Sequence, residues 1–296
     1  MHTRLGKIPI GFRRGWGDWQ QNSLSELADW AREMEFEFLD LMNLSCDDFR
    51  SIEARGMRIG TLDLQHFGKL LSIDKAVRQA TLDANLEMIP RLALVGARKF
   101  FACILGDSSR SRIDNFTMAT TVLSPLCIAA ANANATVAIE GFPGQAPYYP
   151  GVGCTPESVR ALLKEIPKGL GINYDPSHFL RLGIDPIRFL REFLPHVVHV
   201  HAKDTELLPE GVYEFGLYQD STFQPEQSSR RYSGLTWRYR LPGRGSANWP
   251  LILRILADNG YAGGISIELE DEDFIGSEPL EKSGLVASRD FLANLQ

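Results

Sequence analysis

Residues 196–204 read HVVHVHAKD, and this stretch decides the fold of the chain. Polar residues recur there at every second position, at His199, His201 and Lys203. The residues between them are apolar: Val198, Val200 and Ala202. A period of two is that of a β-strand, whose successive side chains point to opposite faces. We therefore expect the apolar face to pack under helices and the polar face to line an interior.

Three other apolar runs end in an acidic residue. They are TVAIEGF at 136–142, GLGINYDPSHF at 169–179 and GGISIELED at 263–271. The acids are Glu140, Asp175 and Glu268, and each closes a run that predicts a buried strand. Charged side chains are seldom buried without a partner. The three acids and His201 lie at the ends of four core strands, and this placement therefore indicates a functional site.

Strand and helix signals alternate eight times along the chain. Four further strand runs come first, at 7–13, 36–42, 58–64 and 97–105. Among the helix starts, Thr155 and Asp185 each place a capping side chain before a proline, and Ser72 is expected to open the longest helix. This alternation predicts parallel strands joined by crossover helices.

Eight such units predict an α/β fold, a (β/α)8 TIM barrel in which residues 1–296 form a single domain. In that fold the carboxyl ends of the strands carry the functional site, and the four polar positions all lie at such ends. An open, doubly wound sheet is the alternative, but no glycine-rich dinucleotide loop follows the first strand. The polar row of residues 196–204 is therefore expected to face the mouth of the barrel.

Composition narrows the class of protein. The apolar fraction of 44% and the charged fraction of 23% are ordinary for a globular protein. The net charge of −6 argues against a nucleic-acid partner. No apolar stretch is expected to reach the roughly 20 residues of a membrane span, and the N-terminus lacks the apolar core of a secretory signal. With four scattered cysteines, these features predict a cytoplasmic protein with reduced thiols.

Glu140, Asp175, His201 and Glu268 together form a predicted binding set for one divalent cation. Three carboxylates gathered at neighbouring strand ends need a cation to neutralise them. A structural network of buried ion pairs is the alternative use of each residue taken singly. Their arrival from four successive strand ends favours the metal.

The motifs, taken as a set, resemble the sugar phosphate isomerase/epimerase superfamily, the xylose isomerase-like TIM barrels. The likeness rests on IEGFPG, NYDPSHFLRLGIDPIRFLREF, HVHAKDTELL, LPGRG and SIELEDEDF, and it extends over nearly the whole chain. It implies that the four polar residues are metal ligands and that His178 contacts the substrate. Members of the superfamily include ketose 3-epimerases, inosose isomerases and dehydratases, and enzymes of 3-keto sugars. The segment between the seventh and eighth strands departs from the compact epimerases, so their substrate does not transfer.

The ligand set predicts the chemistry. Carboxylates with one imidazole suit Mn²⁺, with Mg²⁺ or Co²⁺ as alternatives. Such an ion polarises a carbonyl and stabilises the enediolate formed when a neighbouring proton leaves. Glu140 and Glu268 are the candidate bases, and Lys203, His178 or Glu270 can share the task. We therefore expect a metal-dependent isomerase or epimerase of a keto sugar or sugar derivative.

Two alternatives stay open. A metal-dependent lyase or deglycosidase of a 3-keto glycoside would use the same ion but expel a leaving group instead of returning the proton. A non-catalytic metal- or sugar-binding barrel would keep the ligand set without turnover. The candidate contacts to the sugar or glycoside are His66, His178, Lys203, Arg244 and Trp237.

Residues 205–242 form a long insertion after the seventh strand. Seven aromatic residues lie in it: Tyr213, Phe215, Tyr218, Phe223, Tyr232, Trp237 and Tyr239. The segment is too aromatic for a disordered linker, and aromatic rings suit the C–H faces of sugars. We expect a lid over the active site, and a contact between copies in a homo-oligomer is the alternative.

Overall fold

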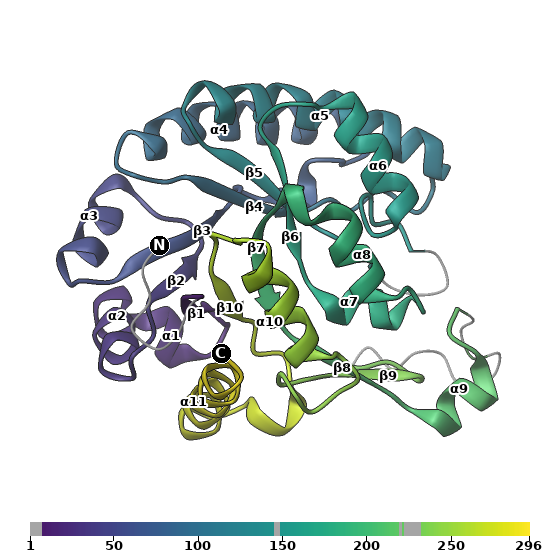
Figure 1. Ribbon diagram of the computed structural model, residues 1–296. Coiled ribbons are helices and arrows are strands. Elements are labelled where there is room, and N and C mark those ends of the chain that lie inside the picture. Colours follow the sequence, from purple (N-terminus) through teal and green to yellow (C-terminus); the bar gives the residue numbers. More distant parts are fainter. Residues whose placement is uncertain (1–7, 145–148, 219–220, 222–231) are drawn as a thin grey trace.

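Eight parallel strands close into a barrel in the computed structural model, which describes residues 8–144, 149–218, 221 and 232–296 (Figure 1). The neighbour order is β1-β10-β7-β6-β5-β4-β3-β2. The barrel strands are β1 (Ile10–Arg13), β2 (Phe38–Leu41), β3 (Arg58–Asp63), β4 (Lys99–Cys103), β5 (Thr136–Glu140), β6 (Leu170–Tyr174), β7 (Val197–Ala202) and β10 (Ile265–Ile267). This arrangement confirms the predicted (β/α)8 barrel.

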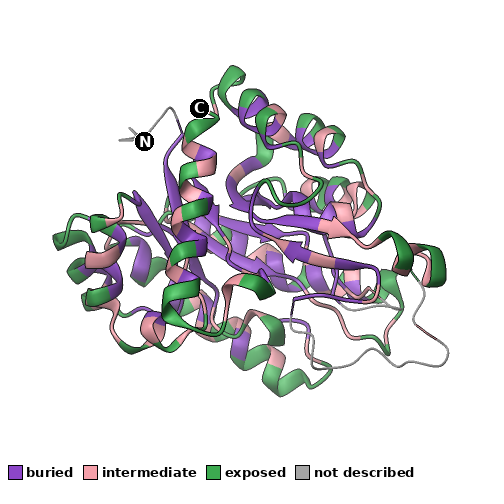
Figure 2. Ribbon diagram, turned by 90° about the horizontal axis from the view of Figure 1, so that it is seen from below, coloured by how far each residue is buried: buried purple, intermediate pink, exposed green. Residues whose placement is uncertain are grey.

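Helices surround the barrel, and their exposed outer faces contrast with the buried strands in Figure 2. The α-helices are α1 (Asp18–Asn22), α2 (Leu24–Glu33), α3 (Cys46–Ala54), α4 (Lys75–Ala93), α5 (Arg112–Asn132), α6 (Pro156–Glu165), α7 (Pro176–Arg181), α8 (Pro186–Phe193), α9 (Pro209–Phe215), α10 (Trp249–Asp258) and α11 (Glu278–Asn294). Short 3-10 turns are η1 (Phe67–Lys69), η2 (Leu194–His196) and η3 (Glu272–Phe274).

Helix starts follow the predicted capping residues in two cases and depart from them in one. The Thr155 hydroxyl caps α6, and the Asp185 carboxylate caps α8. The predicted start at Ser72 is wrong, because the carboxylate of Asp74 caps α4 instead. The Ser72 hydroxyl accepts a hydrogen bond from the Asp74 amide, so it shapes the turn that precedes the helix.

The barrel interior is packed in layers along its axis. Phe38 fills the lower part, where three small positions make room for it: a Cβ at Gly11, Gly60 or Gly264 would lie within 2.6 Å of its ring. Asp40 lies two residues further along β2 and therefore points to the same side, one layer nearer the mouth. The polar site begins at this layer.

The insertion between β7 and β10 is partly regular structure, whereas the sequence predicts a loop. Strand β8 (Asp204–Leu207) pairs antiparallel with β9 (Trp237–Arg240), and α9 follows β8 (Figure 1). Tyr232, Trp237 and Tyr239 form a small buried cluster at this hairpin. Alternation of Trp237 and Tyr239 with arginines in WRYR gives the period of a strand, but its partner lies some 30 residues away in the chain. Phe223 lies outside the described residues.

Helix α5 corrects the expectation that no apolar stretch reaches the length of a membrane span. It is long and apolar enough, by length and composition, to cross a membrane, with a mean hydropathy of 1.2 over its most apolar window. In the barrel it packs beside α4 and β5, with Ala119, Leu123, Cys127 and Ala130 among its buried residues. Packing in the outer helical ring therefore accounts for the apolar residues on its buried side.

Candidate metal centre and active site

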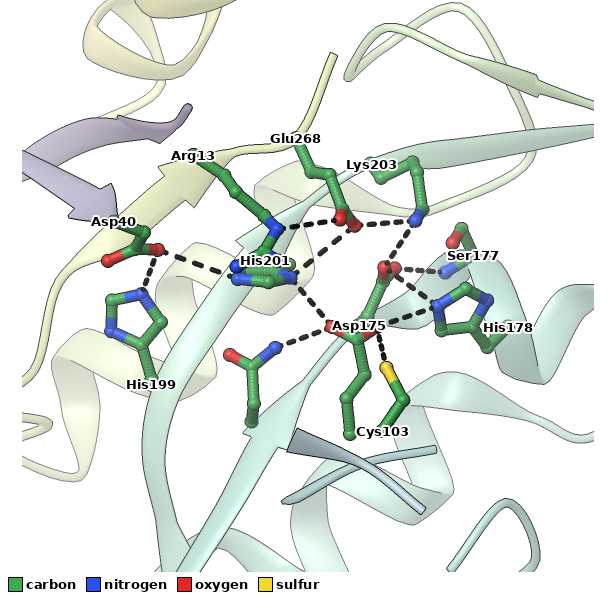
Figure 3. A network of polar contacts seen from close by, with 12 residues as sticks. Arg13, Asp40, Cys103, Asp175, Ser177, His178, His199, His201, Lys203 and Glu268 are labelled. Carbon is green, nitrogen blue, oxygen red and sulfur yellow. Dashed lines mark hydrogen bonds and ion pairs between the residues drawn. The ribbon is translucent and has the colours of Figure 1, made fainter. Parts of the chain in front are cut away.

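The four predicted metal ligands meet at the carboxyl ends of the barrel strands. Figure 3 labels three of them, Asp175, His201 and Glu268. Glu140 is the last residue of β5, Asp175 follows β6 directly, His201 lies in β7 and Glu268 follows β10. Nδ1 of His201 lies 2.6 Å from Oε2 of Glu140 and 3.4 Å from Oε2 of Glu268. The imidazole thus stands between two carboxylates that come from well-separated strands.

Buried atoms in this cluster that make ion-pair contacts but no hydrogen bond fit a cation. Among the described residues, Oδ2 of Asp175 and both ring nitrogens of His201 are buried and make no hydrogen bond. The 2.6 Å approach of His201 to Glu140 is an ion-pair contact that lacks hydrogen-bond geometry. Buried polar atoms are nearly always hydrogen-bonded, so atoms of this kind need another partner. Carboxylate oxygens with one imidazole nitrogen are a donor set that suits Mn²⁺, Mg²⁺ or Co²⁺.

Two groups of possible ligands, with no residue in common, occur in the described part of the chain. Ligand atoms of Glu140, Asp175, His178 and Glu268 lie within 4.8 Å of one another, and those of Asp40, His199 and His201 form a second group. The first group differs from the predicted set in one residue, because it contains His178 where the prediction has His201. The geometry therefore places two imidazoles beside the same carboxylates.

The Glu140 carboxylate is held by four neighbours. Its Oε2 accepts a hydrogen bond from Nδ2 of Asn173 at 2.6 Å, and its Oε1 lies 3.1 Å from Nε2 of His178. Cys103 donates a longer contact from Sγ to Oε1, at 3.6 Å. Burial raises the pKa of Glu140, but the neighbouring His201 and His178 outweigh it and bring the pKa well below its ordinary value. Glu140 is therefore ionised, as a ligand or base must be.

Lys203 balances the acids on the other side of the site. Its Nζ lies 2.5 Å from Oε2 of Glu268, 2.8 Å from Oε2 of Glu270 and 3.3 Å from Oδ2 of Asp175. Burial lowers the pKa of Lys203, but the carboxylates outweigh it and raise the pKa well above its ordinary value. The same contact works against burial to lower the pKa of Glu268. Lys203 is therefore a fixed cation and hydrogen-bond donor.

Asp40 is a site residue that the sequence interpretation missed. Its Oδ2 lies 2.7 Å from Nε2 of His199 and 3.5 Å from Nε2 of His201, and its Oδ1 accepts the amide of Thr61 at 2.7 Å. Burial lowers the pKa of His199 to about 4, although Asp40 opposes the shift. A neutral His199 can donate its Nε2 hydrogen to Asp40, which fixes this carboxylate beneath His201.

Arg13, at the end of β1, was also missed. It makes two hydrogen bonds of 2.7 Å to the carboxylate of Asp63, and its Nε lies 3.4 Å from Oε1 of Glu268. Burial opposes the charge of Arg13, but Asp63 and Glu268 outweigh it and raise the pKa of the guanidinium well above its ordinary value. A charged residue at the end of the predicted strand 7–13 was the signal that could have found Arg13, whereas Asp40 lies inside the predicted strand 36–42.

The remaining predicted substrate contacts lie in different places. His66 is exposed and lines a cavity of about 200 Å³ with Trp16 and Asp63. Trp237 is buried, and the guanidinium of Arg181 lies 3.7 Å from the centre of its ring. Arg244 is exposed over Phe274, and within the described residues no contact joins it to the acidic cluster.

A larger cavity of about 410 Å³ opens on the same end of the barrel. It lies between the segments that follow β1 and β10, and Tyr232 of the insertion joins its wall. Its lining includes Trp16, Trp19, Leu269 and Glu281. None of the four predicted metal ligands lines this cavity, although Leu269 in its wall is adjacent in sequence to Glu268. Aromatic faces beside a carboxylate suit a ring that carries hydroxyl groups.

Comparison with known proteins identifies the family. A family model described as the xylose isomerase-like TIM barrel matches residues 12–295. The chain is 31% identical over 137 residues to the uncharacterized protein YfiH of Bacillus subtilis (strain 168), a match that covers 46% of this chain and 40% of that one. It is 32% identical over 108 residues to an inosose dehydratase of Clostridium botulinum (strain Eklund 17B / Type B), covering 36% of this chain and 33% of the relative.

These two matches thus span well under half of either relative. Among solved structures, the apo 3-keto-D-glucoside 4-epimerase YcjR of E. coli superposes with a TM-score of 0.71 at 18% identity, over 97% of this chain and 100% of that one. At that level of identity the likeness shows a shared fold. Since the family model matches nearly the whole sequence, this chain belongs to the xylose isomerase-like TIM barrel family.

Proposed function

We propose that the protein is a sugar-modifying enzyme, a divalent-metal-dependent isomerase or epimerase of a keto sugar or sugar derivative. Glu140, Asp175, His201 and Glu268 would hold the cation, with Mn²⁺ expected and Mg²⁺ or Co²⁺ as alternatives. The proposal rests above all on the buried atoms of Asp175 and His201 that lack hydrogen bonds among the described residues. It is supported by the similarity to an inosose dehydratase and to a 3-keto-D-glucoside 4-epimerase.

Protein side chains would supply the proton transfers. When bound, the cation would polarise the substrate carbonyl and so acidify the neighbouring C–H bond. Glu140 and Glu268 carry lowered pKa values and come from β5 and from the end of β10, with β6 and β7 between them in the barrel. One carboxylate can remove a proton from one face of the sugar while the other side of the site returns it. Lys203 stays protonated and can donate to a substrate oxygen.

One observation favours the lyase or deglycosidase alternative, namely the aromatic cavity formed by the segments that follow β1 and β10. A free ketose fills little space, whereas the 410 Å³ cavity lined by Trp16, Trp19 and Tyr232 could take the second group of a 3-keto glycoside. Elimination from such a substrate would use the same base but would expel the group lodged in the cavity.

We also propose that the insertion covers the mouth of the barrel within a single domain. Strand β8 begins at Asp204, immediately after Lys203, and Tyr239 of β9 lies 2.8 Å from His178. The hairpin therefore borders the site directly. Covering the mouth would exclude water from the reacting groups.

The experiment is a substrate screen with metal-stripped and Mn²⁺-reloaded protein. Keto sugars and 3-keto glycosides are incubated with each preparation, and the products are followed by proton NMR. The proposal predicts a new epimer or isomer that forms only with the reloaded protein. Release of an aglycone supports the lyase alternative. If bound Mn²⁺ brings no turnover of any of these compounds, the protein is a binding barrel and the proposal fails.

A further inference from the structure

His178 is hydrogen-bonded on both sides of its ring while almost fully buried. Nε2 lies 3.1 Å from Oε1 of Glu140 and 3.4 Å from Oδ2 of Asp175. Nδ1 lies 2.8 Å from the hydroxyl of Tyr239. Figure 3 shows the His178 ring turned toward the acids. A ring held on both nitrogens has its tautomer set by its neighbours.

Arg181 decides the direction of the bond between Tyr239 and His178. Nη1 of Arg181 lies 2.6 Å from the Tyr239 hydroxyl, and a guanidinium can only donate. The hydroxyl oxygen therefore accepts from Arg181, and its own hydrogen needs an acceptor. Among the described residues the acceptor within reach is Nδ1 of His178. If Nδ1 carried a hydrogen, the buried hydroxyl would be left with an unsatisfied donor.

Arg181 is itself held in one orientation. It is fully buried, its Nη2 donates to the backbone oxygen of Gly144 at 3.0 Å, and its guanidinium stacks 3.7 Å from the centre of the Trp237 ring. A planar cation stacked on an aromatic ring and bonded at both terminal nitrogens has little freedom to turn. The direction of the chain from Arg181 through Tyr239 to His178 is therefore fixed by geometry.

We propose that Arg181 and Tyr239 are positioning residues that hold His178 as the tautomer with hydrogen on Nε2. In this state His178 donates a hydrogen bond into the site, toward Glu140 or a substrate oxygen. An imidazole that binds a metal must offer an unprotonated nitrogen, so His178 is a donor and His201 is the imidazole ligand. The proposal thus distinguishes the two imidazoles that lie beside the Glu140 carboxylate.

This positioning of His178 depends on the insertion. Tyr239 and Trp237 both lie on β9, whereas His178 and Arg181 lie on α7 of the barrel. The hairpin thus completes the hydrogen bonding of a residue in the site. This role goes beyond the proposed function, which assigns the insertion only to covering the mouth.

The test is nitrogen NMR of the histidine rings in protein labelled with ¹⁵N-histidine and loaded with Mg²⁺, which is diamagnetic. The chain has six histidines, and the signals of His178 are assigned by their loss in a His178→Gln variant. The wild type is expected to show His178 with a protonated Nε2 and an unprotonated Nδ1. In a Tyr239→Phe variant the hydroxyl donor to Nδ1 is gone, so the Nδ1 signal is expected to shift and the preference to weaken, with the carboxylates of Glu140 and Asp175 as its remaining support.

Tyr218→Phe is the matched control, because it removes another tyrosine hydroxyl of the insertion, one that donates to the backbone oxygen of Leu182. The control is expected to leave the His178 signals unchanged. The inference is overturned if wild-type His178 has hydrogen on Nδ1, or if Tyr239→Phe changes neither the Nδ1 signal nor the share of His178 with hydrogen on Nε2. Turnover of a keto sugar is expected to fall about 10-fold or more in Tyr239→Phe and not in the control. The NMR result stands whatever the substrate, so its failure is distinct from failure of the proposed function.

Discussion

Replacing Asp175 by Asn should remove metal-dependent stabilisation while leaving the metal-free protein nearly as stable. Oδ1 of Asp175 caps α7 through the amide of Ser177 at 2.8 Å, and Asn caps helices as well as Asp does. Lys203, 3.3 Å from Oδ2, keeps two closer carboxylates in Glu268 and Glu270. The substitution therefore chiefly removes one charged oxygen from the predicted cation site.

The magnitude follows from mass action. With free Mn²⁺ at 100 times its dissociation constant, binding adds about 2.7 kcal/mol to the free energy of unfolding. Loss of a residue that hydrogen-bonds to a metal ligand weakens metal binding by up to about 100-fold. Loss of a metal ligand itself should weaken binding at least as much. The same Mn²⁺ would then add only about 0.4 kcal/mol. With an unfolding entropy of about 2.1 cal/mol/K per residue over 296 residues, the missing stabilisation corresponds to about 4 °C in Tm.

The assay is thermal unfolding of both proteins with EDTA and with Mn²⁺, together with elemental analysis of the dialysed samples. We expect the wild type to gain Tm with Mn²⁺ and the Asp175→Asn variant to gain almost nothing, while their Tm values in EDTA agree closely. A full Mn²⁺ shift and full metal content in Asp175→Asn would refute the assignment of Asp175 as a ligand. A large loss of Tm in EDTA would show instead that the carboxylate is mainly structural.

Three further changes test neighbouring parts of the site. The Asp40 carboxylate accepts from the Thr61 amide with one oxygen and from His199 with the other, and Asp40→Asn leaves only one acceptor oxygen for the two donors. We therefore expect the affinity for Mn²⁺, measured by metal titration, to fall about 10- to 100-fold. An unchanged affinity contradicts the positioning role of Asp40. Glu268→Gln should retain some metal but lose turnover by about 100-fold or more, whereas activity close to wild type would rule it out as a base. Trp16→Ala should weaken binding of a 3-keto glycoside about 10-fold more than that of a monosaccharide, at unchanged metal content, and equal losses would remove the cavity from substrate binding.

The sequence was sufficient to predict the barrel because each strand is a short apolar run bounded by capped helices. It also predicted which acids arrive at strand ends, since Glu140, Asp175 and Glu268 interrupt otherwise apolar segments. Asp40 shows the limit of this reasoning. Its partner His199 is 159 residues away, and a single acid in FLDL does not reveal which strands face it across the barrel.

The insertion was the least predictable part for the same physical reason. Pairing of β8 with β9 joins residues more than 30 positions apart, and the period of two in WRYR does not name a partner. Trp237 was predicted to contact substrate, but in the structure its ring stacks with Arg181 of α7. The contact between Tyr239 and His178 depends on that register, so no local pattern could predict it.

The measurement that tests the central claim most directly is incorporation of deuterium from D₂O into recovered substrate. Wild-type protein loaded with Mn²⁺ is incubated with keto sugars and 3-keto glycosides, with Glu206→Gln as the control for a carboxylate on β8 that pairs with Arg238 away from the site. We expect deuterium at a carbon next to the carbonyl with the wild type and the control, and almost none with Glu268→Gln or after removal of the metal. Recovery of every sugar without deuterium, from protein shown to hold its metal, would contradict the proposal that this site moves protons on a keto sugar.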